Sequence, residues 1–122
     1  MSTAQPPSAT DLFTTAVDRL INQVAHWQTG RWAAGLRNDP AVSTGRPGPV
    51  VSRGDRVYAL VQRLADRAAD AEGRPHLPVP RLSDLVLPDQ TRVMANDLLD
   101  CAAPDRVIEE ATDDVDAVRR TL

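Results

Sequence analysis

Apolar residues recur along this chain at alternating intervals of three and four, which is the period of one face of an α-helix. The first stripe predicts a helix that begins near Thr10 or Asp11, after a frayed tail over residues 1–9, and that Gly30 breaks. Its inward positions are Phe13, Val17, Leu20, Val24 and Trp27. Thr29 is then predicted to cap a short helical turn that ends at Gly35.

A second helix is predicted to follow Ser52, a residue type that favours helix N-caps, and to run to about Glu72. Its inward positions are Val57, Leu60, Val61, Leu64 and Ala68. Gly73 is a strong stop signal. Three prolines within residues 74–82 then predict an extended segment that crosses the bundle as a stiff strap.

Two more helices are predicted in the last third of the chain. Ser83 is expected to cap a single turn, and Pro88 suits the first turn of a helix that ends near Ala103. That helix is predicted to turn five residues inward: Val93, Met94, Leu98, Leu99 and Cys101. Pro104 suits the start of the final helix. Its stripe consists of Ile108, Ala111, Val115, Val118 and Leu122.

Residues 36–52 are rich in proline and glycine and follow neither a helix nor a strand period. Because irregular loops of this length are uncommon in compact domains, we expect this loop to be either mobile or functional. No segment alternates as a strand should. The sequence therefore predicts an all-α fold, a small bundle of four main amphipathic helices plus one short helix, in a single domain over residues 10–122.

The composition of the chain excludes several kinds of chemistry but does not identify a function. The 122 residues carry a net charge of −3, and all 14 basic residues are arginine, which suggests a GC-rich, bacterial genome. Without lysine the chain has neither Schiff-base chemistry nor a Walker-type phosphate loop. Its single cysteine excludes an internal disulfide, and too few Cys and His residues remain for a structural zinc site. No signal peptide or membrane span is predicted, so we expect a cytoplasmic protein.

Both tryptophans lie within six residues of each other, beside basic or titratable neighbours. The cluster consists of His26, Trp27, Arg31 and Trp32. Tryptophan and arginine are enriched at binding hot spots, so one interpretation is a partner-binding patch. The competing interpretation is that Trp27 completes the core stripe, Trp32 closes the end of the bundle and Arg31 is solvated.

Residues 31–56 form a basic segment in an acidic protein. They hold five arginines and two aspartates, a net charge of +3: Arg31, Arg37, Arg46, Arg53 and Arg56 against Asp39 and Asp55. Arginines on a loop are suited to binding a carboxylate or a phosphate through paired hydrogen bonds. Neither a dense basic patch nor a recognition helix is evident, so the sequence does not favour direct nucleic-acid binding.

Other polar groups fit ordinary structural roles. An acidic run on the last helix complements the positive end of the helix dipole, and its sign also permits a contact with the basic segment. Carboxylate pairs occur at helical spacing in Asp66/Asp70 and Asp97/Asp100, with arginines nearby to neutralise them. Cys101 is expected to be an inert apolar residue. We therefore predict no catalytic residue, cofactor or metal.

The sequence favours a non-enzymatic interaction or adaptor module that binds a protein partner or itself. Its predicted recognition residues are His26, Trp27, Arg31, Trp32, Arg37, Arg46 and Arg53. One alternative is a small regulator linked to nucleic acid, either as a direct binder or as the acidic partner of a DNA-binding or toxin-like protein. Another is a small-molecule binder or enzyme with a pocket under loop 36–52, lined by Trp27, Trp32 and Tyr58. The wide aliphatic stripes also leave homo-oligomerisation open.

Overall fold

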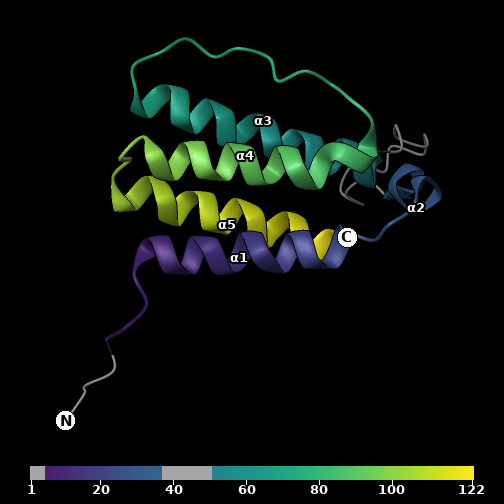
Figure 1. Ribbon diagram of the computed structural model, residues 1–122, viewed down its shortest axis with the longest axis horizontal. Helices are drawn as coiled ribbons and strands as arrows, with labels where there is room; N and C mark the ends of the chain where they lie inside the picture. Colours follow the sequence, from purple (N-terminus) through teal and green to yellow (C-terminus); the bar gives the residue numbers. More distant parts are fainter. Residues whose placement is uncertain (1–4, 37–50) are drawn as a thin grey trace, which may run out of the picture.

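The computed structural model describes residues 5–36 and 51–122. The long helices are α1 (Ala9–Val24), α3 (Arg53–Ala71), α4 (Leu87–Asp100) and α5 (Asp105–Thr121). A short helix, α2 (Thr29–Ala33), follows α1, and a single 3-10 turn, η2 (Asp84–Val86), precedes α4. The predicted all-α bundle of four main helices and a short one is confirmed (Figure 1).

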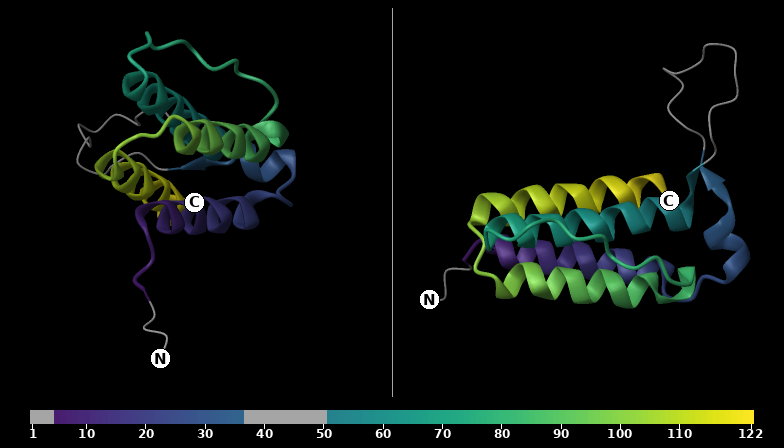
Figure 2. Two further views of the ribbon diagram at one scale, coloured as in Figure 1. Left: turned by 60° about the vertical axis from the view of Figure 1, so that its left-hand side comes forward. Right: turned by 90° about the horizontal axis from the view of Figure 1, so that it is seen from above.

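Helices α1 and α3 lie at opposite corners of the bundle. Each of them packs against both α4 and α5, an arrangement that can be followed in the turned views (Figure 2). The chain crosses from the end of α3 back along the bundle before α4 begins, so α3 and α4 run in the same direction, as do α1 and α5 (Figure 1). Long connectors make such parallel neighbours possible, whereas short ones would force antiparallel hairpins.

The core is formed by the inward stripe of each long helix. Its largest fully buried side chains are Trp32, Phe13, Leu20, Leu64, Leu87, Leu98, Val17, Val24, Val57, Val61 and Val115. Every member of the predicted second-helix stripe is buried. In the last helix, Val118 and Leu122 are only partly buried and pack against the core from its edge. No helix in the described part of the chain is both long and apolar enough to cross a bilayer.

Two capping boxes fix where α1 and α3 begin. Ser8 accepts a hydrogen bond from the Asp11 amide, and the Asp11 carboxylate accepts one from the Ser8 amide. Ser52 and Asp55 repeat this arrangement at α3, as the sequence predicts for Ser52. The first helix begins at Ala9, one or two residues earlier than predicted, because the Ser8–Asp11 box satisfies two backbone N–H groups at its start.

The prediction that the first helix continues to Gly30 is wrong. The helix ends at Val24, and the chain turns through Ala25 and His26 before α2 begins. Trp27 is nevertheless buried, and its amide donates to the Val24 carbonyl over 3.0 Å. The 3–4 spacing thus identified Trp27 as a core residue without identifying the backbone that carries it there.

The expectation of no strand pairing also needs correction. Strands β1 (Gly35–Leu36) and β2 (Val51–Ser52) pair antiparallel, with Gly35 opposite Ser52. Two-residue strands are too short to show a period, so the sequence could not reveal them. The pair joins the two ends of the segment predicted to be a mobile or functional loop, and residues 37–50 of that segment lie outside the described residues.

Helix α4 is rotated from its predicted orientation. Val93 is 52% exposed rather than buried, and the fully buried positions of this helix are Leu87, Thr91, Ala95 and Leu98. The Thr91 hydroxyl donates to the Leu87 carbonyl over 2.8 Å, which allows a polar residue in the core. A threonine and an alanine thus take core positions that hydrophobicity alone assigned to Val93.

Candidate functional site

The two tryptophans of the predicted cluster belong to the hydrophobic core. Trp27 follows α1 and Trp32 lies in α2, with ring centroids 5.1 Å apart and planes inclined by 67°. Trp27 is 5% exposed and Trp32 is 1% exposed. This edge-to-face pair is the geometry that the core interpretation of the cluster requires. The Trp32 ring is therefore not part of the surface that this cluster presents.

Arg31 is the part of the cluster that faces solvent. Its side chain is exposed, and its guanidinium carbon lies 4.7 Å from the centroid of the Trp27 ring. A guanidinium in this position is attracted by the negative face of the indole. Because Trp27 is fixed in the core, the charge of Arg31 is held in place above it. His26 is also exposed, immediately before Trp27.

Arg53 lies at the same end of the bundle, at the start of α3. Its backbone amide donates to the Ala34 carbonyl over 3.0 Å, and its Nε donates to the Leu122 carbonyl over 3.4 Å. Arg53 therefore ties the end of α2 and the end of α5 to the first turn of α3. The two remaining predicted residues, Arg37 and Arg46, lie outside the described residues.

Tyr58 contacts the strap and lines neither of two grooves that lie among the described residues. Its hydroxyl donates to the Val79 carbonyl, on the strap (residues 74–82). One groove, of about 270 Å³, lies between α3 and α5, and the other, of about 220 Å³, lies under the strap. Neither groove is lined by Trp27, Trp32 or Tyr58.

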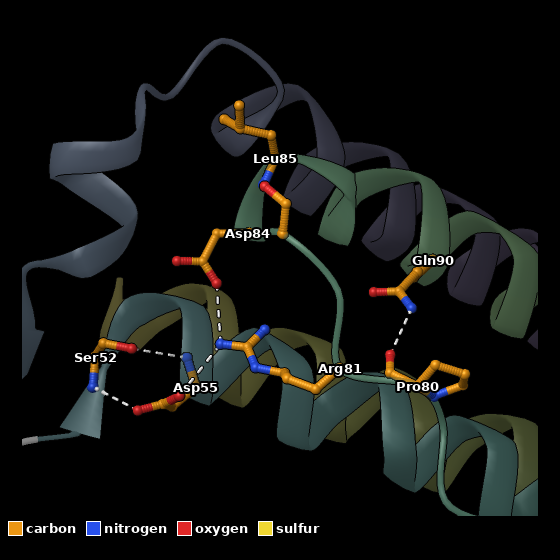
Figure 3. Close-up of polar contacts among 8 residues, drawn as sticks. Ser52, Asp55, Pro80, Arg81, Asp84, Leu85 and Gln90 are labelled. Atoms are coloured by element: carbon orange, nitrogen blue, oxygen red, sulfur yellow. Dashed lines mark hydrogen bonds and ion pairs between the residues drawn. The ribbon is translucent and has the colours of Figure 1, made fainter.

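Arg81 joins the end of the strap to the first turn of α3 (Figure 3). Its Nη2 lies 3.2 Å from Asp55 and 2.9 Å from Asp84, and its guanidinium carbon lies 4.9 Å from the centroid of the Tyr58 ring. A Cβ atom on Gly54 would come within 2.5 Å of the Asp84 carboxylate, so any other residue here would force that carboxylate to shift. Sequence analysis did not identify this cluster, because its members are far apart along the chain.

The strap is also bound to α3 along its middle. Gln62 donates to the Leu77 carbonyl over 3.0 Å and accepts from the Val79 amide over 2.7 Å. The Val79 side chain is 5% exposed, and the Pro80 carbonyl accepts from Gln90 over 3.0 Å. These contacts give the proline-rich segment the structural role predicted for it. They also satisfy three of its backbone groups, the Leu77 and Pro80 carbonyls and the Val79 amide, by hydrogen bonds.

Arginines of α3 pair with carboxylates of α5. Arg63 lies 3.3 Å from Asp114, while Arg67 lies 2.8 Å from both Asp114 and Glu110. Burial lowers the pKa of Arg67, but the hydrogen bonds and charges of Asp114 and Glu110 outweigh it and leave the pKa raised. Part of the acidic run on the last helix is therefore neutralised within the bundle by α3.

Cys101 is the residue that follows the last turn of α4. Cys101 is half-buried, and its thiol donates to the Leu98 carbonyl over 3.1 Å. Within residues 5–36 and 51–122, no group of three or more His, Cys, Asp or Glu side chains is placed to hold a metal ion. Comparisons with protein-family models, curated proteins and solved structures give no match.

Proposed function

We propose that this chain is a non-enzymatic, cytoplasmic protein–protein interaction module whose recognition surface is the end of the bundle that carries α2. The observation that carries the proposal is the position of Arg31, exposed and held over the buried Trp27 ring. A preorganised guanidinium loses less side-chain entropy on binding than a free one. Arginine is also among the residues that most often dominate interface energies.

Exposed apolar side chains near this end support a protein as the partner. Leu82 is 55% exposed and Leu85 is 53% exposed, and η2, which carries Leu85, packs against α2. A charged anchor beside apolar side chains is the mixture found in the centres of protein interfaces. The partner is another protein or a second copy of this chain.

The paired state of many arginines favours a protein over a nucleic acid. Within residues 5–36 and 51–122, five of them form ion pairs with carboxylates: Arg63, Arg67, Arg74, Arg81 and Arg92. A paired guanidinium contributes less to phosphate binding, because its charge is already compensated. The net charge of −3 adds a general repulsion from the phosphate backbone.

Site-specific photocrosslinking in the native host tests this proposal. A photoreactive residue at Gly30 suits the purpose, because a side chain there meets no atom within 4 Å of its Cβ. We expect a discrete crosslinked product at position 30 and its loss in the Arg31→Ala background, with Arg31→Lys intermediate because lysine lacks the planar stacking group. The binding loss for Arg31→Ala should be at least about tenfold.

The matched control places the same probe at Arg106, an exposed residue in the first turn of α5, at the far end of the bundle. The proposal is contradicted if the products at positions 30 and 106 are the same, or if Arg31→Ala leaves the product at position 30 unchanged. Circular dichroism of Arg31→Ala should match that of the unaltered protein, since Arg31 is exposed. A crosslink to the chain itself would identify a second copy as the partner.

A further inference from the structure

Three arginines of α3 form a row that faces α5, and α5 neutralises only two of them. The row is Arg56, Arg63 and Arg67, at helical spacings of seven and four. Asp114 and Glu110 supply the carboxylates for the last two. Helix α5 runs antiparallel to α3, so its later residues face Arg56 (Figure 1). Those residues are Ala117, Val118 and Thr121, none of which carries a charge.

Arg56 therefore lacks the partner that its neighbours have. Its Nε is buried and has no hydrogen-bond partner within the described part of the chain. Buried polar groups are nearly always hydrogen-bonded, so such an atom calls for an explanation. A buried donor without an acceptor is also costly, more so when the group is charged. The residue as a whole is only partly buried, so a carboxylate that binds its guanidinium from outside would compensate the charge.

The space beside Arg56 is shaped to admit a side chain. Short residues, Ala59 on α3 and Ala117 on α5, leave a groove of about 270 Å³ between the two helices. Leu60 and Val118 add apolar surface, and Arg56, Arg63 and Asp114 supply the charged groups of its lining. The Asp114 carboxylate is paired with Arg63 and Arg67, which leaves Arg56 as the cation in the lining that has no carboxylate partner among the described residues. The groove thus places the Arg56 guanidinium beside the apolar side chains of Leu60 and Val118. Its volume lies just below the range of small-molecule pockets.

We propose that this groove binds the carboxylate of an acidic side chain on a helical segment of a partner protein. The carboxylate accepts hydrogen bonds from the Arg56 guanidinium, and an apolar neighbour one helical turn away lies on Ala59 and Ala117. Charge complementarity carries the choice of occupant. Asp114 already compensates Arg63 within the groove, and the incoming carboxylate compensates Arg56 in the same way. The site is distinct from the α2 surface and does not rest on the function proposed there.

A peptide helix suits this groove better than a free organic acid. The groove runs between two helices and is partly open to solvent, whereas small-molecule sites enclose most of their ligand. A helix laid along a groove gains apolar contact beyond the single carboxylate, which is a recurring mode of peptide recognition. The carboxylate then adds orientation and specificity through a charge-assisted pair.

Nuclear magnetic resonance with defined peptides tests this site. The probe is a stapled, alanine-rich helical peptide with one glutamate and a leucine one turn away, compared with its glutamine counterpart. We expect the glutamate peptide to shift the Arg56 Nε–H signal and the methyl signals of Ala59 and Ala117. The glutamine peptide should bind at least about tenfold more weakly, because charge-assisted hydrogen bonds are the stronger ones.

Two variants test whether peptide binding depends on the groove itself. Arg56→Gln removes the cation, and Ala117→Leu fills the groove at an exposed position, so each should weaken the glutamate peptide at least about tenfold. Arg106→Gln, which removes one exposed charge at the other end of α5, should leave binding unchanged.

Several outcomes would overturn the proposal. Equal binding of the glutamate and glutamine peptides would do so, as would the absence of a shift at Arg56. Two further measurements are a titration with hexanoate, a free organic acid, and a dilution series without peptide. Hexanoate binding as tightly as the peptide, or shifts at Arg56 that depend only on protein concentration, would also overturn it. The last two would replace the peptide with a free acid and with a second copy of the chain, respectively. Each variant's folding is checked by its dispersion of methyl signals.

Discussion

His76 on the strap lies against Asp70 on α3, with its Nε2 2.6 Å from the Asp70 Oδ1. Its other ring nitrogen, Nδ1, lies 3.7 Å from Asp66, one helical turn earlier. Both nitrogens of one imidazole therefore face carboxylates, an arrangement that favours the doubly protonated ring. The hydrogen bond to Asp70 is the main cause of a raised pKa for His76, and the charges of Asp66 and Asp70 add to it against a smaller opposing effect of desolvation.

The titration of His76 should show this environment directly. We expect its NMR midpoint to lie above the ordinary value of 6.5, and Asp70→Asn to move it down. A group whose pKa is raised by folding stabilises the fold below its unfolded pKa and loses that effect as the pH rises through its folded pKa. The difference in urea midpoint between the unaltered protein and His76→Gln should thus be present at pH 5.5 and vanish at high pH. Asp113→Asn, an exposed change on α5, should leave the His76 midpoint unchanged.

Helices α3 and α4 end on residues with left-handed backbone conformations, but only one of these residues is glycine. Gly73, after α3, has φ of 68°, and Ala102, after α4, has φ of 55°. A Cβ atom disfavours this conformation by roughly 1 kcal/mol. Ala102→Gly should therefore raise the free energy of unfolding by up to about 1 kcal/mol, and Gly73→Ala should lower it by a similar amount.

Chemical denaturation measures both effects. The matched control is Ala25→Gly, at the end of α1, where φ is −60° and the right-handed conformation suits alanine. Glycine there should destabilise the protein, because it adds only flexibility to the unfolded chain. An Ala102→Gly variant that is less stable than the unaltered protein would contradict the role assigned to this backbone conformation.

Gly54 leaves room for the Asp84 side chain of η2 to lie close to α3. A Cβ at Gly54 would meet the Asp84 carboxylate at 2.5 Å and displace it from Arg81. Gly54→Ala should therefore lower the free energy of unfolding by about 1–3 kcal/mol, although alanine normally favours a helix. Removing the obstacle with Asp84→Ala should make Gly54→Ala neutral or stabilising. Equal costs in both backgrounds would contradict this. Gly30→Ala, with no atom within 4 Å, is the control.

Gln62 holds the strap through two backbone groups. Gln62→Ala leaves the buried Val79 segment with an unpaired amide, since that amide donates to the Gln62 side chain over 2.7 Å. An unsatisfied buried donor costs about 1–3 kcal/mol. We expect hydrogen exchange of the Val79 amide to accelerate about tenfold or more. Gln28→Ala, where the side chain makes no capping bond, should leave that exchange rate unchanged.

Helical stripes and end signals predicted most of this architecture, because those features are local. Ser52 identified the start of α3, Gly73 its end, and the prolines of residues 74–82 the strap. The two-residue strands could not be predicted, since their pairing depends on residues 15 or more positions apart. Trp27 also shows that a stripe does not determine the backbone. The spacing correctly placed Trp27 in the core, but α1 ends at Val24 and a turn carries Trp27 there.

The groove at Arg56 depends on the relative orientation of two helices, which stripe patterns do not give. The spacing of Arg56, Arg63 and Arg67 is visible in the sequence, as is the acidic run of α5. Which arginine lacks a carboxylate follows only from the antiparallel packing of α3 on α5. Ala59 and Ala117 are likewise ordinary helix residues until they face one another across the groove.

Trp32 provides the sharpest test of how the α2 end is built. It is 1% exposed and packs edge-to-face on Trp27, so Trp32→Ala should lower the free energy of unfolding by about 3–5 kcal/mol in urea denaturation. Arg31→Ala removes only an exposed cation–π contact and should cost about 0.5–1 kcal/mol. The two substitutions lie side by side in α2 and so serve as mutual controls. If Trp32→Ala cost no more than Arg31→Ala, the indole would be a surface group, and Arg31 would lose the rigid support on which its role in recognition depends.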